Sequence, residues 1–228
     1  MYGLLISTAI LINILLAEKL IKKDHKNPEI LWELATISVL FGILGARIYH
    51  VIDYGQYYQS NLVQILYLWN GGLGIFGAII GGAASAYVYL KIKKQDFWYY
   101  ISTIIIFLPL SQAIGRWGNY FNQEIVGTTT NLPWGMYLNG IKYHPIFLYE
   151  SILNLILFII LITLKTTKNL EPKKIIGVYL GGYGLIRFLL EFIRPNSWSV
   201  YNTNIAQLVS IIFLTISYIL ITRKKSVQ

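Results

Sequence analysis

Seven apolar runs, most of them long enough to cross a lipid bilayer, constrain this chain more than any other feature. They lie at residues 2–17, 34–52, 62–90, 98–114, 146–164, 175–193 and 205–221, the first being the shortest. A spanning helix needs about 20 apolar residues. The 55% hydrophobic content of the 228 residues also exceeds that of ordinary soluble domains. We predict an all-α, polytopic membrane protein with about seven transmembrane helices, forming one integral domain over residues 1–228.

The basic residues predict the orientation of these helices. The formal net charge is +9, and fourteen of the nineteen Lys and Arg residues fall into four clusters. The clusters are Lys19, Lys22, Lys23 and Lys26; Lys91, Lys93 and Lys94; Lys165, Lys168, Lys173 and Lys174; and Arg223, Lys224 and Lys225. They occupy every second connection, as cytoplasmic loops do. The pattern predicts an external N-terminus and a cytoplasmic C-terminus, and it argues against nucleic acid as a partner.

The first apolar run is predicted to remain as a helix. It lacks the basic start and the A-x-A-like cleavage site of a signal peptide, and charged residues follow it directly. The chain has no cysteine, which excludes a disulfide, a thiolate metal site and a cysteine nucleophile. Any thiol chemistry must therefore use a thiol that belongs to the substrate.

Four arginines within or beside the apolar runs predict an anionic ligand. They are Arg47, Arg116, Arg187 and Arg194, all near predicted external helix ends. An ionisable group inside a membrane is costly, so a functional role is the default hypothesis. The embedded carboxylates on the same side are Glu124, Glu150 and Glu191. Four cations facing three carboxylates leave one positive charge in excess, which an external anion would balance.

The segment "GGYGLIRFLLEFIRP" predicts a polar face on an apolar helix. Its polar residues are spaced by four, four and three positions, so they share one helical face: Tyr183, Arg187, Glu191 and Arg194. Taken alone, the Arg187–Glu191 pair has an alternative interpretation, a contact that only joins this helix to a neighbour. Similar clusters on other helices favour a site.

The segment "GRWGNYFNQEIVG", residues 115–127, is such a cluster. On a continued helix Arg116, Asn119 and Gln123 would share a face, whereas Asn122 would point elsewhere, so we expect the helix to end near Asn122. Arginine, amide and carboxylate side chains together suit a phosphate. A helix cap with interhelical hydrogen bonds accounts for only part of this cluster.

Two further motifs have less specific interpretations. "WNGGLGIFGAIIGG" lacks the GK[ST] of a phosphate-binding loop, so a nucleotide site is disfavoured. Gly77 and Gly81 predict close helix packing, whereas the turn at Gly71 and Gly72 predicts a ligand contact. His144, which opens "HPIFLYE", is more often a cap or a packed imidazole than a catalyst.

Together these segments resemble the prolipoprotein diacylglyceryl transferase family over almost the whole chain. The resemblance is carried by "MYGLL", "GARIYHV", "WNGGLGIFGA", "GRWGNYFNQEIVG", "HPIFLYE" and "GYGLIRFLLEFIRP". It implies an enzyme of the bacterial cytoplasmic membrane that transfers the diacylglyceryl group of phosphatidylglycerol to a thiol. The thiol is that of the lipobox cysteine in a prolipoprotein signal peptide, and the products are a thioether and glycerol phosphate. The resemblance implies no cofactor and no metal.

The resemblance also implies roles for individual residues near the external leaflet. Arg116 and Arg187 would clamp the phosphoglycerol head. The residues implied in catalysis are Glu191, Glu124, Asn119 and Tyr2. The other residues implied in phosphatidylglycerol binding are Gly127, Asn122, Tyr183, Arg194, His144, Gly71 and Gly72.

One departure from the family pattern concerns the proton acceptor. Where members commonly carry a histidine before the glycine of the third span, this chain has Phe76, which cannot accept a proton. Glu191, Glu124, Tyr2 or His144 would then serve as the base. The alternative is a non-catalytic protein of the same fold that binds anionic phospholipid or lipoprotein signal peptides. A transporter is disfavoured because no inverted repeat of broken helices is found.

Overall fold

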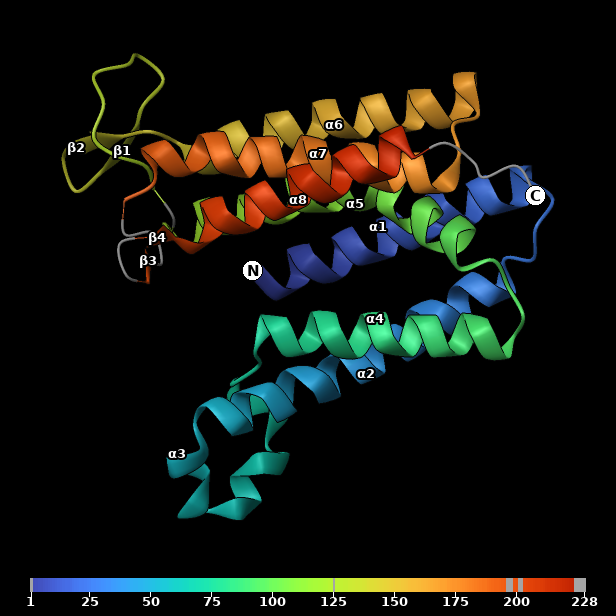
Figure 1. Cartoon of the computed structure of the whole chain (residues 1–228). Helices are drawn as coiled ribbons and strands as arrows, with labels where there is room; N and C mark the ends of the chain where they lie inside the picture. The colour runs from blue at the N-terminus through green and yellow to red at the C-terminus, as the bar shows by residue number, and fades with distance from the viewer. Residues whose placement is uncertain (1, 125, 196–198, 201–202, 224–228) are drawn as a thin grey trace. The chain divides into compact units, whose positions relative to one another are not determined.

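The computed structural model describes residues 2–124, 126–195, 199–200 and 203–223, and it confirms the predicted all-α membrane fold. Seven helices in the described residues are long and apolar enough to span a bilayer (Figure 1). They are α1 (Tyr2–Lys23), α2 (Glu29–Asp53), α4 (Ile75–Ile92), α5 (Phe97–Phe121), α6 (Ile146–Lys168), α7 (Pro172–Leu190) and α8 (Ile205–Thr222).

Short elements lie between these helices. The helical ones are α3 (Gly55–Gln59), η1 (Leu62–Leu66), η2 (Leu68–Asn70) and η3 (Glu191–Ile193). Two antiparallel pairs are the described strands: β1 (Met136–Leu138) with β2 (Ile141–Tyr143), and β3 (Ser199–Val200) with β4 (Thr203–Asn204). The chain divides into two compact units, Met1–Leu20 with Ile101–Gln228, and Ile21–Tyr100.

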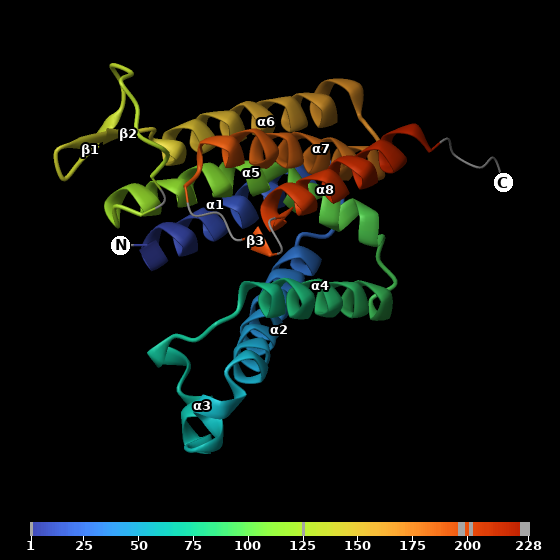
Figure 2. The same cartoon turned by 60° about the vertical axis from the view of Figure 1, so that its left-hand side comes forward.

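In the unit Ile21–Tyr100, α2 and α4 lie side by side (Figures 1 and 2). Glycines permit this approach. A Cβ on Gly77 would overlap the carbonyl oxygen of Gly45, and a Cβ on Gly81 would overlap that of Phe41. The predicted small-residue packing at Gly77 and Gly81 is therefore confirmed, because backbones in a membrane approach closely only where side chains are absent.

The boundaries of two predicted spans were wrong. The apolar run 62–90 does not continue as one helix, because α4 begins only at Ile75. Gly71 and Gly72 have φ values of 81° and 72°, which lie outside the right-handed helical region and break the chain direction there. The first run is not the shortest span, since α1 has 22 residues whereas α4 and α8 have 18. The helix α1 continues past the apolar residues through the charged residues that follow them, up to Lys23.

In the other unit, polar side chains join the helices. Ser217 Oγ on α8 donates to the carbonyl oxygen of Gly177 on α7 at 2.7 Å, and Ser151 Oγ on α6 donates to that of Ala113 on α5 at 3.0 Å. Asn13 on α1 donates to Ser111 Oγ on α5 at 3.2 Å. Such interhelical hydrogen bonds replace the hydrophobic driving force that lipid cannot supply.

The connection from α5 to α6 is fastened to the end of α7. The Gly127 amide donates to the His144 carbonyl at 2.9 Å, and the Thr128 amide donates to the Ile193 carbonyl at 2.8 Å. Beyond these contacts the chain forms the β1–β2 hairpin. The ends of α5 and α7 and the start of α6 are thereby held at one end of this unit.

Candidate anion-binding site

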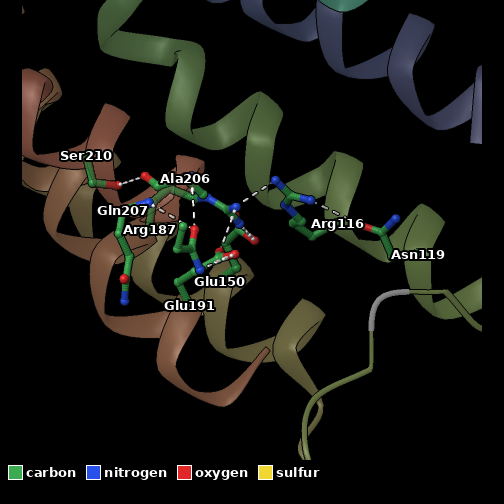
Figure 3. Close-up of polar contacts among 9 residues, drawn as sticks. Arg116, Asn119, Glu150, Arg187, Glu191, Ala206, Gln207 and Ser210 are labelled. Carbon is green, nitrogen blue, oxygen red and sulfur yellow. Dashed lines mark hydrogen bonds and ion pairs between the residues drawn. The ribbon is translucent and has the colours of Figure 1, made fainter. Parts of the chain in front are cut away.

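Four charged side chains from α5, α6, α7 and η3 meet at this end of the unit (Figure 3). We call them the arginine clamp: Arg116, Glu150, Arg187 and Glu191. Glu150 lies between the arginines. Its Oε1 is 2.8 Å from Arg116 Nη2, and its Oε2 is 3.6 Å from Arg187 Nη1. Arg187 Nη2 is also 3.2 Å from Glu191 Oε2. One carboxylate thus bridges both arginines.

Burial differs between the two kinds of clamp residue. The Glu150 and Glu191 side chains are 1% and 2% exposed, whereas those of Arg187 and Arg116 are 15% and 22% exposed. A buried carboxylate is stable only when it is paired. The carboxylates therefore act as the inner support, and the guanidinium groups keep an outer edge that a ligand can reach.

Residues 115–127, which we call the signature segment, include Arg116 on the last turns of α5. The helix ends at Phe121, which confirms the predicted end near Asn122. Gln123 has φ 55°, so the chain turns away from the helical face that Gln123 would otherwise share. Asn119 stays on that face, and its Oδ1 accepts a hydrogen bond from Arg116 Nη1 at 3.3 Å. Asn119 is 3% exposed and orients the guanidinium.

The carboxylate partner of Arg116 comes from another helix. Glu124 is exposed, and its Oε1 accepts a hydrogen bond from Asn122 at 3.3 Å. Glu150, in the second turn of α6, makes the ion pair with Arg116. From the sequence, Glu150 was counted among the embedded carboxylates but was not predicted as a site residue. A carboxylate inside an apolar span needs a partner in a membrane, and this could have identified it.

The predicted polar face is present, although its α-helix, α7, ends at Leu190 and a 3-10 turn follows. Tyr183 stacks on Tyr179 with ring centroids 5.8 Å apart. Glu191 begins the 3-10 turn η3. Arg187 and Glu191 nevertheless keep their i,i+4 contact.

Asn204, directly before α8, also contacts Glu191 and was not among the residues predicted from the sequence. Its Oδ1 accepts from the Ala206 and Gln207 amides at 3.0 and 3.2 Å, and its Nδ2 donates to Glu191 Oε1 at 3.4 Å. The signal was an asparagine directly before an apolar run, which is typical of a helix N-cap.

Arg194 follows η3 in extended conformation, with φ −95° and ψ 114°. It is half-buried. Burial and the nearby Arg187 cation lower the pKa of Arg194 below its ordinary value, while Glu191 acts in the opposite direction. Its guanidinium has no ion pair with any residue that the structure describes. The clamp residues therefore act on the charge of Arg194, although none of them forms an ion pair with it.

Gly127 and His144 pack closely against each other. A Cβ on Gly127 would lie 2.6 Å from the His144 Cβ and 2.9 Å from the His144 carbonyl oxygen. His144 Nδ1 is 3.2 Å from the Tyr149 hydroxyl, to which Trp134 Nε1 donates at 2.9 Å. His144 is thus a packed imidazole with a phenol partner.

The remaining predicted residues belong to other segments. In the unit Ile21–Tyr100, Arg47 donates to five backbone carbonyls, those of Gln64, Ile65, Tyr67, Gly71 and Gly72. These contacts account for its burial, since Arg47 has no ion pair among the described residues. A cavity of about 360 Å³ lies beside it, lined by Arg47, His50, Tyr54, Tyr57, Tyr58, Gln64, Asn70, Gly71 and Gly72. Whether Gly71 and Gly72 contact a ligand stays a prediction.

Tyr2, which the resemblance implied in catalysis, is the first residue of α1. Its side chain is outside the described part of the structure.

The clamp carries chemical groups that suit an anion. Guanidinium groups present planar pairs of N–H donors that match phosphate oxygens, and Asn119 adds an amide beside them. Among the described residues, no group of three or more His, Cys, Asp or Glu side chains is placed to hold a metal ion.

Comparisons with known proteins identify the family of this chain. The family model of prolipoprotein diacylglyceryl transferases matches residues 1–223. The phosphatidylglycerol–prolipoprotein diacylglyceryl transferase of Clostridioides difficile (strain 630) is 39% identical over 211 residues, which cover 92% of this chain and 85% of that protein. The enzyme of the same name from Trichormus variabilis is 40% identical over 230 residues, covering 94% and 82%. That from Listeria monocytogenes serotype 4a is 35% identical over 228 residues, covering 95% and 82%. The chain belongs to the prolipoprotein diacylglyceryl transferase family.

Proposed function

We propose that this protein transfers the diacylglyceryl group of phosphatidylglycerol to the lipobox cysteine thiol of prolipoproteins, the first step of lipoprotein maturation. The observation that carries the proposal is the arginine clamp. Two partly accessible arginines form ion pairs with two buried carboxylates at the end of an apolar helix bundle. The names of the curated relatives supply the two substrates.

In this proposal Arg116 and Arg187 bind the phosphodiester of the lipid. Glu150 and Glu191 hold the two guanidinium groups at a set separation before the lipid arrives. A receptor that is organised in advance does not have to reorganise as charge develops in the transition state. The carboxylates are thus positioning residues, and the arginines contact the substrate.

The reaction is a displacement at the glyceryl carbon that carries the phosphate. The substrate sulfur attacks this carbon, a C–S bond forms, and the C–O bond to phosphate breaks. The electron pair of that bond stays on the phosphate oxygen, and glycerol phosphate leaves. The thiol proton passes to a base. Alignment of the two reactants and stabilisation of the phosphate charge are the contributions expected from the protein.

The contacts of the candidate bases distinguish them. Glu191 has both oxygens engaged, Oε2 by Arg187 and Oε1 by Asn204, and therefore serves to orient Arg187. Glu124 is exposed and accepts one hydrogen bond from Asn122. His144 faces the Tyr149 hydroxyl. We propose that the proton acceptor is Glu124 or His144, because neither is held by an arginine.

The proposed orientation places the clamp towards the external leaflet. The basic clusters lie in the α1–α2, α4–α5 and α6–α7 connections and after α8. The clamp lies at the opposite ends of α5, α6 and α7. Cytoplasmic connections carry the excess of Lys and Arg, so the N-terminus would be external and the C-terminus cytoplasmic.

Mass spectrometry of a lipobox peptide tests the function directly. Purified protein in detergent is mixed with phosphatidylglycerol and the peptide, and the added diacylglyceryl mass is measured. Lys142→Ala is the matched control, since this basic residue lies in the external hairpin. We expect product from wild type and Lys142→Ala, and none from Arg116→Ala or from a peptide whose cysteine is replaced by serine.

A lack of product would contradict the proposal. If folded wild-type protein makes no thioether while a curated relative modifies the same peptide, the transferase proposal is wrong. The non-catalytic binder of anionic phospholipid or signal peptides then takes its place.

A further inference from the structure

The uncompensated positive charge of the site belongs to Arg194. The clamp contains two arginines and two carboxylates, so it carries no net charge when all four are ionised. Arg194 is within electrostatic range of all four clamp residues. Since its guanidinium has no ion pair with a described residue, its charge is available to a ligand.

The proposed reaction changes the charge of the ligand. The phosphodiester of phosphatidylglycerol carries one negative charge. When the glyceryl C–O bond breaks, the electron pair remains on phosphate oxygen and the product is a monoester, whose second ionisation has a pKa of about 6. At neutral pH the bound phosphate therefore gains a second negative charge during the displacement. A cation that interacts more strongly with the doubly charged phosphate than with the singly charged one favours this step.

Backbone hydrogen bonds hold Arg194 next to Glu191 of the clamp. Its amide donates to the Glu191 carbonyl at 3.3 Å, and the preceding carbonyl, that of Ile193, accepts from Thr128 at 2.8 Å. The base of the side chain is thus fixed beside the clamp. Arg116 and Arg187, in contrast, have their guanidinium groups held by carboxylates.

We propose that Arg194 binds the phosphomonoester leaving group and compensates the second negative charge that appears as the glyceryl C–O bond breaks. Arg116 and Arg187 bind the diester of the incoming lipid, and Arg194 adds affinity for the product form. This inference rests on the proposed transferase function and assigns one residue to one stage of that reaction.

Ligand binding separates this role from general anion binding. The probes are glycerol phosphate, a monoester, and its methyl ester, a diester that keeps a single charge at every pH used. Affinities of the purified protein in detergent are measured at about pH 5 and about pH 8. For wild type we expect the monoester to bind about tenfold more tightly at the higher pH, because one further charge–charge contact forms. The affinity for the diester should be the same at both pH values.

Two variants test whether Arg194 is responsible. In Arg194→Gln the pH dependence of monoester binding should fall to within about twofold, with diester affinity within about threefold of wild type. Arg194→Lys keeps the charge and should retain most of the dependence. Lys142→Gln is the control, and its affinities should match those of wild type.

Kinetics supply a second readout. Arg194→Gln should lower kcat about 10- to 100-fold and change the KM for phosphatidylglycerol less than about threefold, since the contact strengthens only in the transition state. Arg194→Met, which keeps the apolar stem, replaces Arg194→Gln if the latter does not fold.

The outcomes distinguish the inference from the function on which it rests. If wild type makes thioether but Arg194→Gln keeps the preference for the doubly charged monoester, the assignment of Arg194 is wrong. It is also wrong if Arg194→Gln weakens both probes equally and raises KM alone. If wild type makes no thioether, the proposed function itself is lost, whatever the variants bind.

Discussion

Arg116 Nη2 lies 2.8 Å from Glu150 Oε1, so an ion pair joins the end of α5 to the start of α6. Glu150 Oε2 is also 3.6 Å from Arg187 Nη1 on α7. A single carboxylate that is 1% exposed therefore lies within ion-pair distance of both arginines. The geometry of the clamp depends on this residue of α6, which lies outside the signature segment.

Glu150→Gln should separate the arginines while the fold is kept. The amide retains the size of the side chain and removes the charge that offsets two neighbouring cations. We expect kcat/KM at least about 100-fold lower, a loss of about 2.7 kcal/mol in transition-state stabilisation. Transfer kinetics measure the effect, and Asp53→Asn, at an exposed carboxylate of the other unit, is the control. Activity near that of wild type would show that Glu150 does not position the arginines.

Asn204 combines two roles that substitutions can separate. Asn204→Ala removes the N-cap of α8 and the hydrogen bond to Glu191, and loss of the cap alone costs about 1 kcal/mol. Asn204→Ser keeps a capping oxygen but lacks the amide donor. We expect thermal unfolding of Asn204→Ser to resemble wild type, while its transfer rate falls as far as that of Asn204→Ala. If the serine variant is fully active, the contact with Glu191 has no role in the reaction.

Two glycines of the signature segment should respond in opposite ways to alanine. A Cβ on Gly115 meets nothing within 4 Å, and the residue lies inside α5, so Gly115→Ala should raise stability by about 0.8 to 1 kcal/mol. A Cβ on Gly127 would lie 2.6 Å from the His144 Cβ. Gly127→Ala should therefore displace the α5–α6 connection and lower activity. Thermal unfolding and transfer assays of both variants make the comparison, and equal behaviour would contradict the packing described for Gly127.

Arg47 is expected to be structural. Its five carbonyl contacts hold residues 64–72, and hydrogen bonds to a charged group contribute about 1.5 to 3 kcal/mol each. Lysine has one nitrogen and cannot reach all five acceptors. We expect Arg47→Lys to lower the melting temperature and to expose residues 64–72 to protease. Limited proteolysis followed by mass spectrometry locates the cuts, and an unchanged digestion pattern would contradict this role.

The charge excess predicted from the sequence came from counting ionisable groups without knowing their partners. Four arginines facing three carboxylates predicted one uncompensated cation. In the structure Arg47 is held by backbone carbonyls in the other unit, and Glu124 is exposed beside Asn122. Arg194, which follows Glu191 in the chain, has no ion pair with a described residue. Sequence can count ionisable groups near helix ends, whereas their pairing depends on which helices come into contact.

The amino-acid sequence by itself determined the class of fold, the seven spans and the polar face that carries Arg187 and Glu191, because hydrophobic length and helical period are local properties. The tertiary structure decided that Glu150 bridges both arginines and that Asn204 holds Glu191. It also decided that the helix of the third run begins at Ile75 rather than Leu62. Each of these depends on partners distant in sequence: an acid on α6, a cap on α8, and an arginine on α2 that binds the loop before α4. A buried charge must find such a partner, and only the packing of the helices determines which one is within reach.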